Sequence, residues 1–304
     1  MSFRTVIITK ESKLSLRMNQ LIIKNDNLSR IPLNEITCLV IEHPNVTMTG
    51  HLMIALSDQK IVMILCNAKH LPNTLLLPLY GHHRQARLIQ NQMSWKSERK
   101  AQLWQLLVKH KILNQKQVVQ ECFKESSIEL FDAFTNSVEL DDSTNREGHT
   151  AKVYFNIILE SGHARGDDTI QNAAMDYGYQ VLLAIVARTI VSKGYLTELG
   201  IKHHNEFNIY NLASDFMEIF RPLIDYLVLK NVDQQFGTDQ KRAILNILNR
   251  KLKVENKRYY FLSAVEIYVD SLFKYLSTGD IEVVKIPTWT YSSNMDFKKV
   301  TNVF

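Results

Sequence analysis

Two acidic side chains and an imidazole stand close together in the second half of this sequence. Asp215 and Glu218 are three residues apart, and His203 precedes them. On a helix, two residues at this spacing have their Cβ atoms about 5 to 6 Å apart on one face. Carboxylate oxygens suit hard cations such as Mg²⁺, and Mn²⁺ accepts an imidazole nitrogen more readily. The three residues therefore predict a site for a divalent metal ion.

A further acidic residue lies upstream, where a helical pattern begins. Glu147 is followed by a segment that contains Tyr154 and Phe155. An isolated Glu at a helix start more often compensates the helix dipole than binds a metal, so the residues alone leave its role open. A histidine likewise has a core or surface role more often than a metal role. His204, next to His203, is the alternative ligand or a proton shuttle.

Both segments, in this order, resemble the core of the CRISPR-associated adaptation integrase family, whose members insert captured DNA fragments into a CRISPR array. The resemblance extends over nearly the whole chain. The matching residues are Gly200, Ile201, His203, Asp215, Met217, Glu218, Phe220, Arg221 and Pro222, with Asp176, Tyr177, Gly178 and Tyr179 in the helix between the two segments. The branch that it looks most like is type II-A, on the residues His203, Asn205, Phe207, Asn208 and Glu218.

The resemblance implies a catalytic metal site that holds Mg²⁺ or Mn²⁺. Glu147, His203 and Glu218 are the expected direct ligands and catalytic residues. Asp215 is expected either to bind the metal through water or to orient His203. Arg221 is expected to clamp one of these carboxylates, with a phosphate contact as the alternative. A hard cation at such a site can neutralise charge on phosphate oxygens and orient an attacking DNA 3′-hydroxyl.

The same resemblance implies a set of partners. They are double-stranded DNA with 3′ ends, CRISPR repeat DNA, a second copy of the chain and a small ferredoxin-like adaptation protein. In the type II-A branch a ring-shaped end-binding protein and the effector nuclease join them. Two other functions stay open at this point. One is a structure-specific metal-dependent DNA endonuclease, in which water replaces the 3′-hydroxyl, and the other is a non-catalytic helical DNA-binding adaptor.

Positive charge is concentrated in two segments of the chain. The net charge is only +5, yet residues 82–116 hold eight Lys and Arg against one acidic residue, and residues 241–258 hold seven against one. Clustered cations favour a polyanion as the partner, although a solvated helix face is the common alternative. The residues predicted to bind DNA are Arg84, Arg87, Lys251 and Lys253.

The elements that must position these side chains change in character near residue 80. Strands are predicted over residues 5–9, 15–23, 37–42, 46–49 and 61–66, with one helix over 50–59. After Tyr80 and Gly81, helices are predicted over residues 88–113, 118–134, 150–159, 170–192, 207–229 and 241–276, followed by an extended or partly disordered tail over 279–304. The predicted fold class is therefore α+β.

This pattern and the resemblance together give two domains: residues 1–80 as a small β-rich dimerisation domain, and residues 81–304 as a larger all-helical catalytic domain with an extended tail. The three cysteines lack any Cys-x-x-Cys pairing, which makes a disulfide framework or a zinc knot improbable. No apolar run approaches the roughly 20 residues that cross a bilayer. A bacterial cytoplasmic location without a membrane partner is expected.

Overall fold

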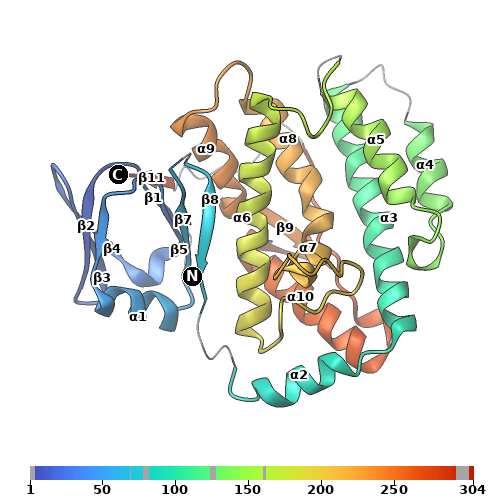
Figure 1. Cartoon of the computed structure of the whole chain (residues 1–304), viewed down its shortest axis with the longest axis horizontal. Coiled ribbons are helices and arrows are strands. Elements are labelled where there is room, and N and C mark those ends of the chain that lie inside the picture. The colour runs from blue at the N-terminus through green and yellow to red at the C-terminus, as the bar shows by residue number, and fades with distance from the viewer. Residues whose placement is uncertain (1–3, 69, 78–81, 124–127, 160–161, 292–300) are drawn as a thin grey trace.

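The fold is described here from a computed structural model, in which residues 4–68, 70–77, 82–123, 128–159, 162–291 and 301–304 are placed. Two sheets stand side by side at one end of the molecule, and the remainder is mainly helical (Figure 1). The strands come mainly from the first part of the chain and the helices from the later part. The predicted α+β fold class, a β-rich region followed by a helical one, is confirmed. The predicted change of character at Tyr80 and Gly81 lies outside the described residues.

The strands at that end form one five-stranded and one four-stranded sheet. The first has the order β11-β1-β5-β7-β8, with β1 Arg4–Ile8, β5 Ile36–Ile41, β7 Val62–Cys66, β8 Pro72–Leu76 and β11 Thr301–Val303. Its strands pair in parallel except β8, which is antiparallel to β7. The second has the order β4-β3-β2-β6, with β2 Ser12–Arg17, β3 Gln20–Lys24, β4 Leu28–Pro32 and β6 Val46–Met48.

The five-stranded sheet is buried on both faces. Val6 and Leu39 belong to the core between the two sheets, which helix α1 (Gly50–Asp58) also contacts. Ile7 and Val40 point the other way, into the core that the sheet shares with the helices. A parallel sheet covered on both sides requires uninterrupted apolar strands, and all six residues of β5 are buried. The sheet and the helical region are therefore joined by one continuous core.

The helical region is organised around α6, which lies between the sheet and helices α8, α3 and α5 (Figure 1). Its helices are α2 Gln85–Met93, α3 Ser97–Cys122, α4 Glu129–Asn136, α5 Arg146–Ile158, α6 Ile170–Ser192, α7 Asn211–Met217, α8 Arg221–Asn231, α9 Thr238–Leu245 and α10 Phe261–Thr278. Short 3₁₀ turns are η1 Leu33–Glu35, η2 Leu140–Asp142, η3 Glu218–Phe220, η4 Asn246–Asn249 and η5 Ile281–Val283. Gly178 of α6 lets α8 approach, because a Cβ there would lie 2.3 Å from Ile224 Cγ2.

Several predicted elements have different boundaries in the structure. The predicted strand over 15–23 is a hairpin, since Met18 and Asn19 adopt positive φ and form a two-residue turn between β2 and β3. The predicted break at 113–118 is absent, and α3 runs through it with Asn114 and Gln115 buried. The predicted helix over 118–134 was therefore wrong as one element, because α3 ends at Cys122 and α4 begins later. Residues 124–127 lie outside the described part.

The predicted helix over residues 241–276 was wrong. Two helices, α9 and α10, are separated by the hairpin of β9 Lys251–Val254 and β10 Lys257–Tyr260. Exposed and buried side chains alternate along β9, as expected for a strand with one covered face. The helical region thus contains one two-stranded sheet and is not all-helical.

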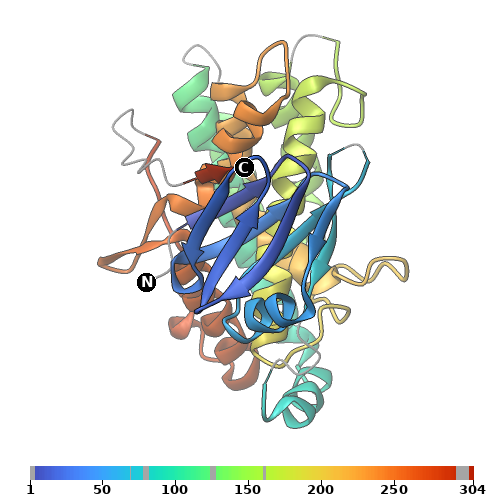
Figure 2. The same cartoon turned by 90° about the vertical axis from the view of Figure 1, so that its left-hand side faces the viewer.

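The end of the chain returns to the first sheet. Strand β11 pairs in parallel with β1, and the Phe304 amide donates to the Ile7 carbonyl at 2.9 Å. Figure 2 shows the C-terminus beside the N-terminal strands. Within the predicted tail, residues 281–283 form the 3₁₀ turn η5 and residues 301–303 form β11, while 292–300 lie outside the described residues. The last strand therefore belongs to a sheet on the other side of the predicted boundary at residue 80.

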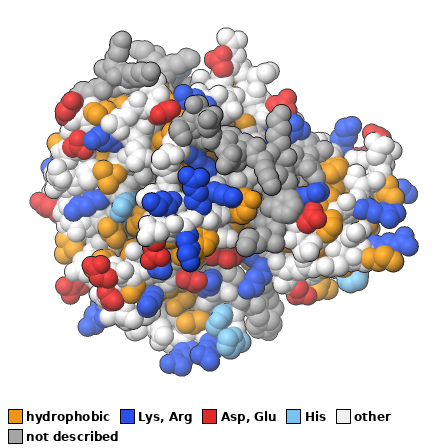
Figure 3. Space-filling view, turned by 180° about the vertical axis from the view of Figure 1, so that it is seen from behind, with side chains coloured by type: hydrophobic (Ala, Val, Ile, Leu, Met, Phe, Trp, Pro, Cys, Tyr) orange, Lys and Arg blue, Asp and Glu red, His pale blue; other side chains and the backbone are white. Residues whose placement is uncertain are grey.

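The residues predicted to bind DNA lie on two separate elements. Arg84 and Arg87 are exposed at the start of α2, and Lys251 and Lys253 are exposed on β9, where Arg258 lies opposite Lys253. Figure 3 shows Lys, Arg and His side chains close together at the lower end of the molecule, the end at which Figure 1 shows α2. None of the helices that the structure describes is long and apolar enough to cross a membrane.

We expect one buried ion pair to hold the sheet to the helical region. Lys241 Nζ of α9 lies 2.6 Å from Glu42 Oε1, just after β5, and both side chains are buried. Lys241→Met leaves the buried Glu42 carboxylate with only the exposed His70 ring, whose Nδ1 is 3.4 Å from the same oxygen, so it should lower the free energy of unfolding by about 3 kcal/mol. Denaturant unfolding measures the change.

The neighbouring Arg242 supplies the control for that measurement. It pairs with Asp239 at 3.4 Å on the surface, where an ion pair contributes about 0 to 1 kcal/mol. Arg242→Met should therefore lower the free energy of unfolding by no more than about 1 kcal/mol. Equal losses in Lys241→Met and Arg242→Met would contradict the assignment of Glu42 and Lys241 as the pair that matters.

Candidate functional site

Two of the predicted ligands lie on either side of a buried lysine. The Nζ of Lys111, on α3, is 2.5 Å from Glu147 Oε1 and 2.5 Å from Glu218 Oε2. Lys111 is 5% exposed and Glu218 4%, while the Glu147 side chain is 29% exposed. Burial lowers the pKa of Lys111, but the charges of Glu218 and Glu147 raise it by more, so the ammonium form is favoured. The structure thus brings Glu147 and Glu218 to one place, around a positive charge.

The chain just before Glu147 fixes the start of α5. Asp142 accepts the backbone N–H groups of Arg146 at 2.8 Å and of Glu147 at 3.0 Å, which satisfies free donors of the first turn. Asn145 is the N-cap residue and accepts from the Gly148 N–H at 3.3 Å. Asp142 and Asn145 both have positive φ, a strained conformation for residues other than glycine. Glu147 therefore stands on a helix end that local hydrogen bonds hold in one orientation.

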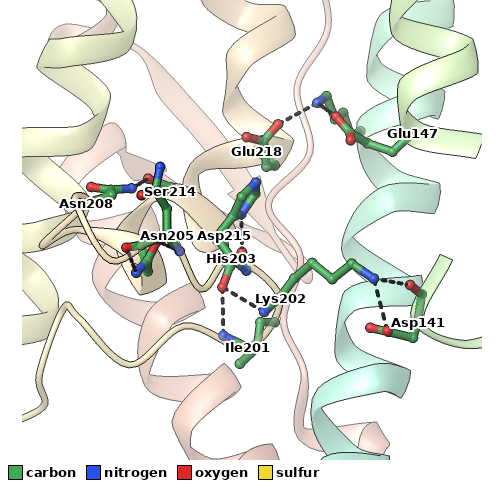
Figure 4. A network of polar contacts seen from close by, with 12 residues as sticks. Asp141, Glu147, Ile201, Lys202, His203, Asn205, Asn208, Ser214, Asp215 and Glu218 are labelled. Carbon is green, nitrogen blue, oxygen red and sulfur yellow. Dashed lines mark hydrogen bonds and ion pairs between the residues drawn. The ribbon is translucent and has the colours of Figure 1, made fainter. Parts of the chain in front are cut away.

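Asp215 is fully buried and gathers the loop that carries His203. Its Oδ2 accepts the N–H groups of Ile201 at 2.7 Å and Lys202 at 3.0 Å, and its Oδ1 accepts that of His203 at 3.1 Å. Gly200 makes this wrapping possible, because a Cβ there would lie 2.8 Å from Asp215 Oδ2 and 2.3 Å from the His203 carbonyl oxygen. Figure 4 shows the loop folded around this carboxylate.

The same carboxylate orients the His203 ring. The Nδ1 of His203 lies 2.5 Å from Asp215 Oδ1, and since a carboxylate only accepts, Nδ1 carries the hydrogen. The hydrogen bond to Asp215 raises the pKa of His203, and burial offsets part of that rise. Nε2, which has no hydrogen-bond partner among the described residues, is left as the metal-binding or proton-carrying nitrogen. The ring also makes an edge contact with Trp104, at 5.7 Å between centroids.

This geometry separates the roles that the sequence left open. Both histidines are exposed, and of the two it is His203 that contacts Asp215. Four hydrogen bonds occupy the two oxygens of Asp215, which favours the orienting role over metal binding. Arg221 lies beside Glu218, with Nε 3.1 Å from Oε1, which agrees with a clamp. Burial raises the pKa of Glu218, but Arg221 and Lys111 lower it by more, so the carboxylate stays ionised.

Behind Arg221 lies a further buried carboxylate, which the sequence did not indicate. Asp225 is 1% exposed and accepts hydrogen bonds from the hydroxyls of Tyr179 and of Tyr154, the latter at 2.9 Å. Burial raises the pKa of Asp225 to about 6, against the lowering effect of these two donors. The Arg221 guanidinium lies over the Tyr179 ring at 4.7 Å. Asp225 thus fixes the ring against which the clamp of Glu218 packs.

The Lys111 ammonium, which lies between Glu147 and Glu218, shows how well these carboxylates fit a metal cation. An ammonium lies between Glu147 and Glu218, so their oxygens are spaced to hold a positive charge. Within the described residues, no three His, Cys, Asp or Glu side chains are grouped closely enough to hold a metal ion unaided. The donor types fit Mg²⁺ or Mn²⁺, and the space between the carboxylates is taken by Lys111.

Sequence reasoning missed Lys111 as a site residue because it was counted within a basic segment. Three cations of that segment have internal roles: Lys111 here, Lys116 paired with Asp132 at 2.6 Å, and Arg99, which donates to carbonyls at the end of α10. A signal was present. Lys111 falls on the same helical stripe as the buried residues Trp104, Leu107, Val108 and Val118. A lysine on an apolar stripe needs a buried anion. The predicted DNA contacts lie on other elements, α2 and β9, and do not contribute to this cluster.

Most of the chain matches a known protein family. Residues 5–255 match the family model of CRISPR associated protein Cas1. The chain is 31% identical over 293 residues to the CRISPR-associated endonuclease Cas1 of Neisseria meningitidis serogroup C (strain 8013). The aligned region covers 94% of this chain and 96% of that protein.

Solved structures share the fold at lower identity. A casposase bound to integration product has a TM-score of 0.75 and 17% identity, with 92% of each chain covered. A chain of a Cas6-RT-Cas1–Cas2 complex has a TM-score of 0.72 and 16% identity, covering 96% of this chain and 37% of that one. At these identities the likeness concerns the fold.

His203 and His110 should titrate on opposite sides of the ordinary histidine pKa. The bond to Asp215 raises the pKa of His203 above 6.5, whereas burial lowers that of His110 on α3. A raised folded-state pKa means that the His203–Asp215 pair stabilises the protein below about pH 6.5, and that this contribution is lost as the pH rises through the folded value. NMR titration of labelled histidines in the metal-free protein measures both values. A His203 pKa below that of His110 would contradict the arrangement.

Proposed function

The chain belongs to the CRISPR associated protein Cas1 family, and on that premise we propose that it inserts captured foreign DNA fragments into a CRISPR array. The reaction is attack of a fragment 3′-hydroxyl on a phosphodiester of the repeat. The observation that carries the proposal is the pair of carboxylates, Glu147 and Glu218, which converge on one cation, together with a His203 ring oriented by Asp215. The fold likeness to a casposase bound to integration product supports integration as the chemistry.

In this proposal Glu147, Glu218 and the Nε2 of His203 hold Mg²⁺ or Mn²⁺. When bound, such a cation neutralises charge on the phosphate oxygens and orients the attacking hydroxyl. Asp215 acts through His203, because its own oxygens are taken by the loop and the ring. Arg221 keeps Glu218 ionised and in place. The alternative, a structure-specific endonuclease, uses the same residues with water as the attacking group, and the curated relative is named an endonuclease.

Partners belong to the same proposal. Double-stranded DNA with 3′ ends and CRISPR repeat DNA would contact Arg84 and Arg87 near α2 and Lys251 and Lys253 on β9, where exposed cations suit phosphates. A small ferredoxin-like adaptation protein is supported by the fold likeness to a chain of a Cas6-RT-Cas1–Cas2 complex. The homodimer, the type II-A branch, the ring-shaped end-binding protein and the effector nuclease rest on the sequence resemblance and stay predictions.

Substitution of the proposed ligands should abolish strand joining. Glu147→Gln, His203→Gln and Glu218→Gln each remove a metal ligand while keeping most of the side-chain volume. Gln is preferred to Ala at position 218 because Ala would leave Lys111 and Arg221 short of a buried partner. Each variant should lose more than 100-fold in joining of a fragment to a supercoiled array plasmid with Mn²⁺, about 2.7 kcal/mol. Joining within about tenfold of the parent would withdraw that residue as a ligand.

The same assay distinguishes the alternatives. An integrase gives fragment joined to the plasmid, an endonuclease gives cleaved plasmid without joining, and an adaptor gives neither. His204→Gln is the matched control, because His204 neighbours His203 in sequence and is exposed in the structure. It should retain joining. A greater loss in His204→Gln than in His203→Gln would exchange the two roles.

The two basic elements should each add phosphate contacts to DNA binding. Phosphate contacts release counterions, so each one lost should flatten the log-log salt dependence of affinity on duplex by about 0.9. Arg84→Glu with Arg87→Glu should therefore flatten the slope by about two, whatever the DNA sequence, and Lys251→Glu with Lys253→Glu should do likewise. Affinity over a salt series measures this. Lys116→Glu is a single-site control whose lysine already pairs with Asp132. Slopes unchanged in both double variants would remove these surfaces from the proposal.

A further inference from the structure

Lys111 has the burial and the contacts of a bound cation. Its ammonium lies 2.5 Å from one oxygen of each of two carboxylates that come from different elements, α5 and η3. These are the two carboxylates to which the proposed function assigns a metal. A surface lysine seldom holds two carboxylates in this way, because ordering a long side chain costs entropy that a solvated pair does not return. The position on the apolar stripe of α3 makes the pairing obligatory for this side chain.

The charges around this place are already balanced. Glu147 and Glu218 carry two negative charges, and Lys111 and Arg221 carry two positive ones. A divalent cation added to this group, with all four side chains in place, would leave two positive charges without counter-charges in a largely buried site. Uncompensated buried charge costs several kcal/mol. Metal binding and the present position of Lys111 therefore exclude each other.

We propose that Lys111 is a resident cation that holds Glu147 and Glu218 together before metal enters, and that metal binding displaces its ammonium from between them. This inference rests on the metal site of the proposed function. The exchange has a route, because the Glu147 side of the cluster is partly open to solvent while Glu218 is not. A lysine stem of four methylenes can withdraw its head without moving the helix.

The arrangement has two consequences for the metal-free protein. Without Lys111, two carboxylates would face each other in a poorly solvated place, so the fold should be less stable. The same two carboxylates would then be free to bind a divalent cation without first breaking two ion pairs, so the affinity for metal should rise. A lysine with only a structural role predicts the first consequence but not the second.

The test measures Mn²⁺ binding in Lys111→Met and Lys111→Gln, both in the full chain. The dissociation constant comes from the electron paramagnetic resonance signal of free Mn²⁺, and thermal unfolding is followed with and without Mn²⁺. Both variants should bind Mn²⁺ at least tenfold more tightly than the parent, about 1.4 kcal/mol. Their unfolding midpoints should lie below that of the parent without metal and recover when Mn²⁺ is added.

Lys116→Met is the matched control. Lys116 lies on the same helix and pairs with Asp132 at 2.6 Å, away from the site and closer to solvent. Its substitution should leave the dissociation constant of Mn²⁺ unchanged. A rise in affinity in this control equal to that in Lys111→Met would mean that any lost positive charge on α3 has the effect, and would overturn the inference.

Three other outcomes also test the displacement of Lys111. Affinity unchanged or weakened in folded Lys111 variants would overturn the inference and leave the metal site standing. Variants that stay unfolded at saturating Mn²⁺ would overturn it too, because a metal would then be unable to replace the lysine. If Glu147→Gln and Glu218→Gln bind Mn²⁺ as tightly as the parent, the proposed metal site itself fails, and the displacement of Lys111 fails with it.

Discussion

Burial of carboxylates in one short stretch is the constraint around which this molecule is arranged. Asp215, Glu218 and Asp225 lie within eleven residues along α7, η3 and α8, and they are 0%, 4% and 1% exposed. A carboxylate taken from water costs free energy unless donors or positive charges replace the water. The chain supplies those groups from distant elements, with Lys111 from α3 and the Tyr179 hydroxyl from α6. The packing of α3 and α6 against this stretch is therefore electrostatic as well as apolar.

The three carboxylates are compensated by different kinds of group, and this difference sets what each can do. Asp215 is held mainly by backbone N–H groups, which cannot leave without unfolding the loop, so it is suited to hold His203 in place. Asp225 is held by two neutral hydroxyls, and burial raises its pKa to about 6. Glu218 is held by two flexible cationic side chains, Lys111 and Arg221. Of the three, only Glu218 can exchange a partner for a metal ion at the cost of side-chain movement alone.

How far the sequence predicts this structure depends on how local each signal is. Residue types and spacing grouped His203, Asp215 and Glu218, and the resemblance gave Glu147 a metal-binding role. The structure brings Glu147 and Glu218 to Lys111, and His203 to Asp215. The hairpin of β9 was missed although Leu252 and Val254 alternate with exposed lysines, since the longer helical pattern outweighed four residues. Strand β11 was missed as a strand because its partner β1 lies at the other end of the chain. Lys111 was missed because a charge count treats every lysine as a surface residue.

Glu147 and His203, the two outer ligands of the proposed metal site, are positioned in the same way. Asp142 accepts the N–H groups that open α5 and so fixes Glu147, while Asp215 accepts the N–H groups of the 201–203 loop and so fixes His203. In each case a carboxylate that is not itself a proposed direct ligand holds the backbone that carries one. Glu218, between them, needs no such support because it is part of a buried turn between two helices. The separation of the outer ligands is thus set by backbone hydrogen bonds at a helix start and in a loop, so the adjustment when Lys111 gives way to a metal ion falls to side chains.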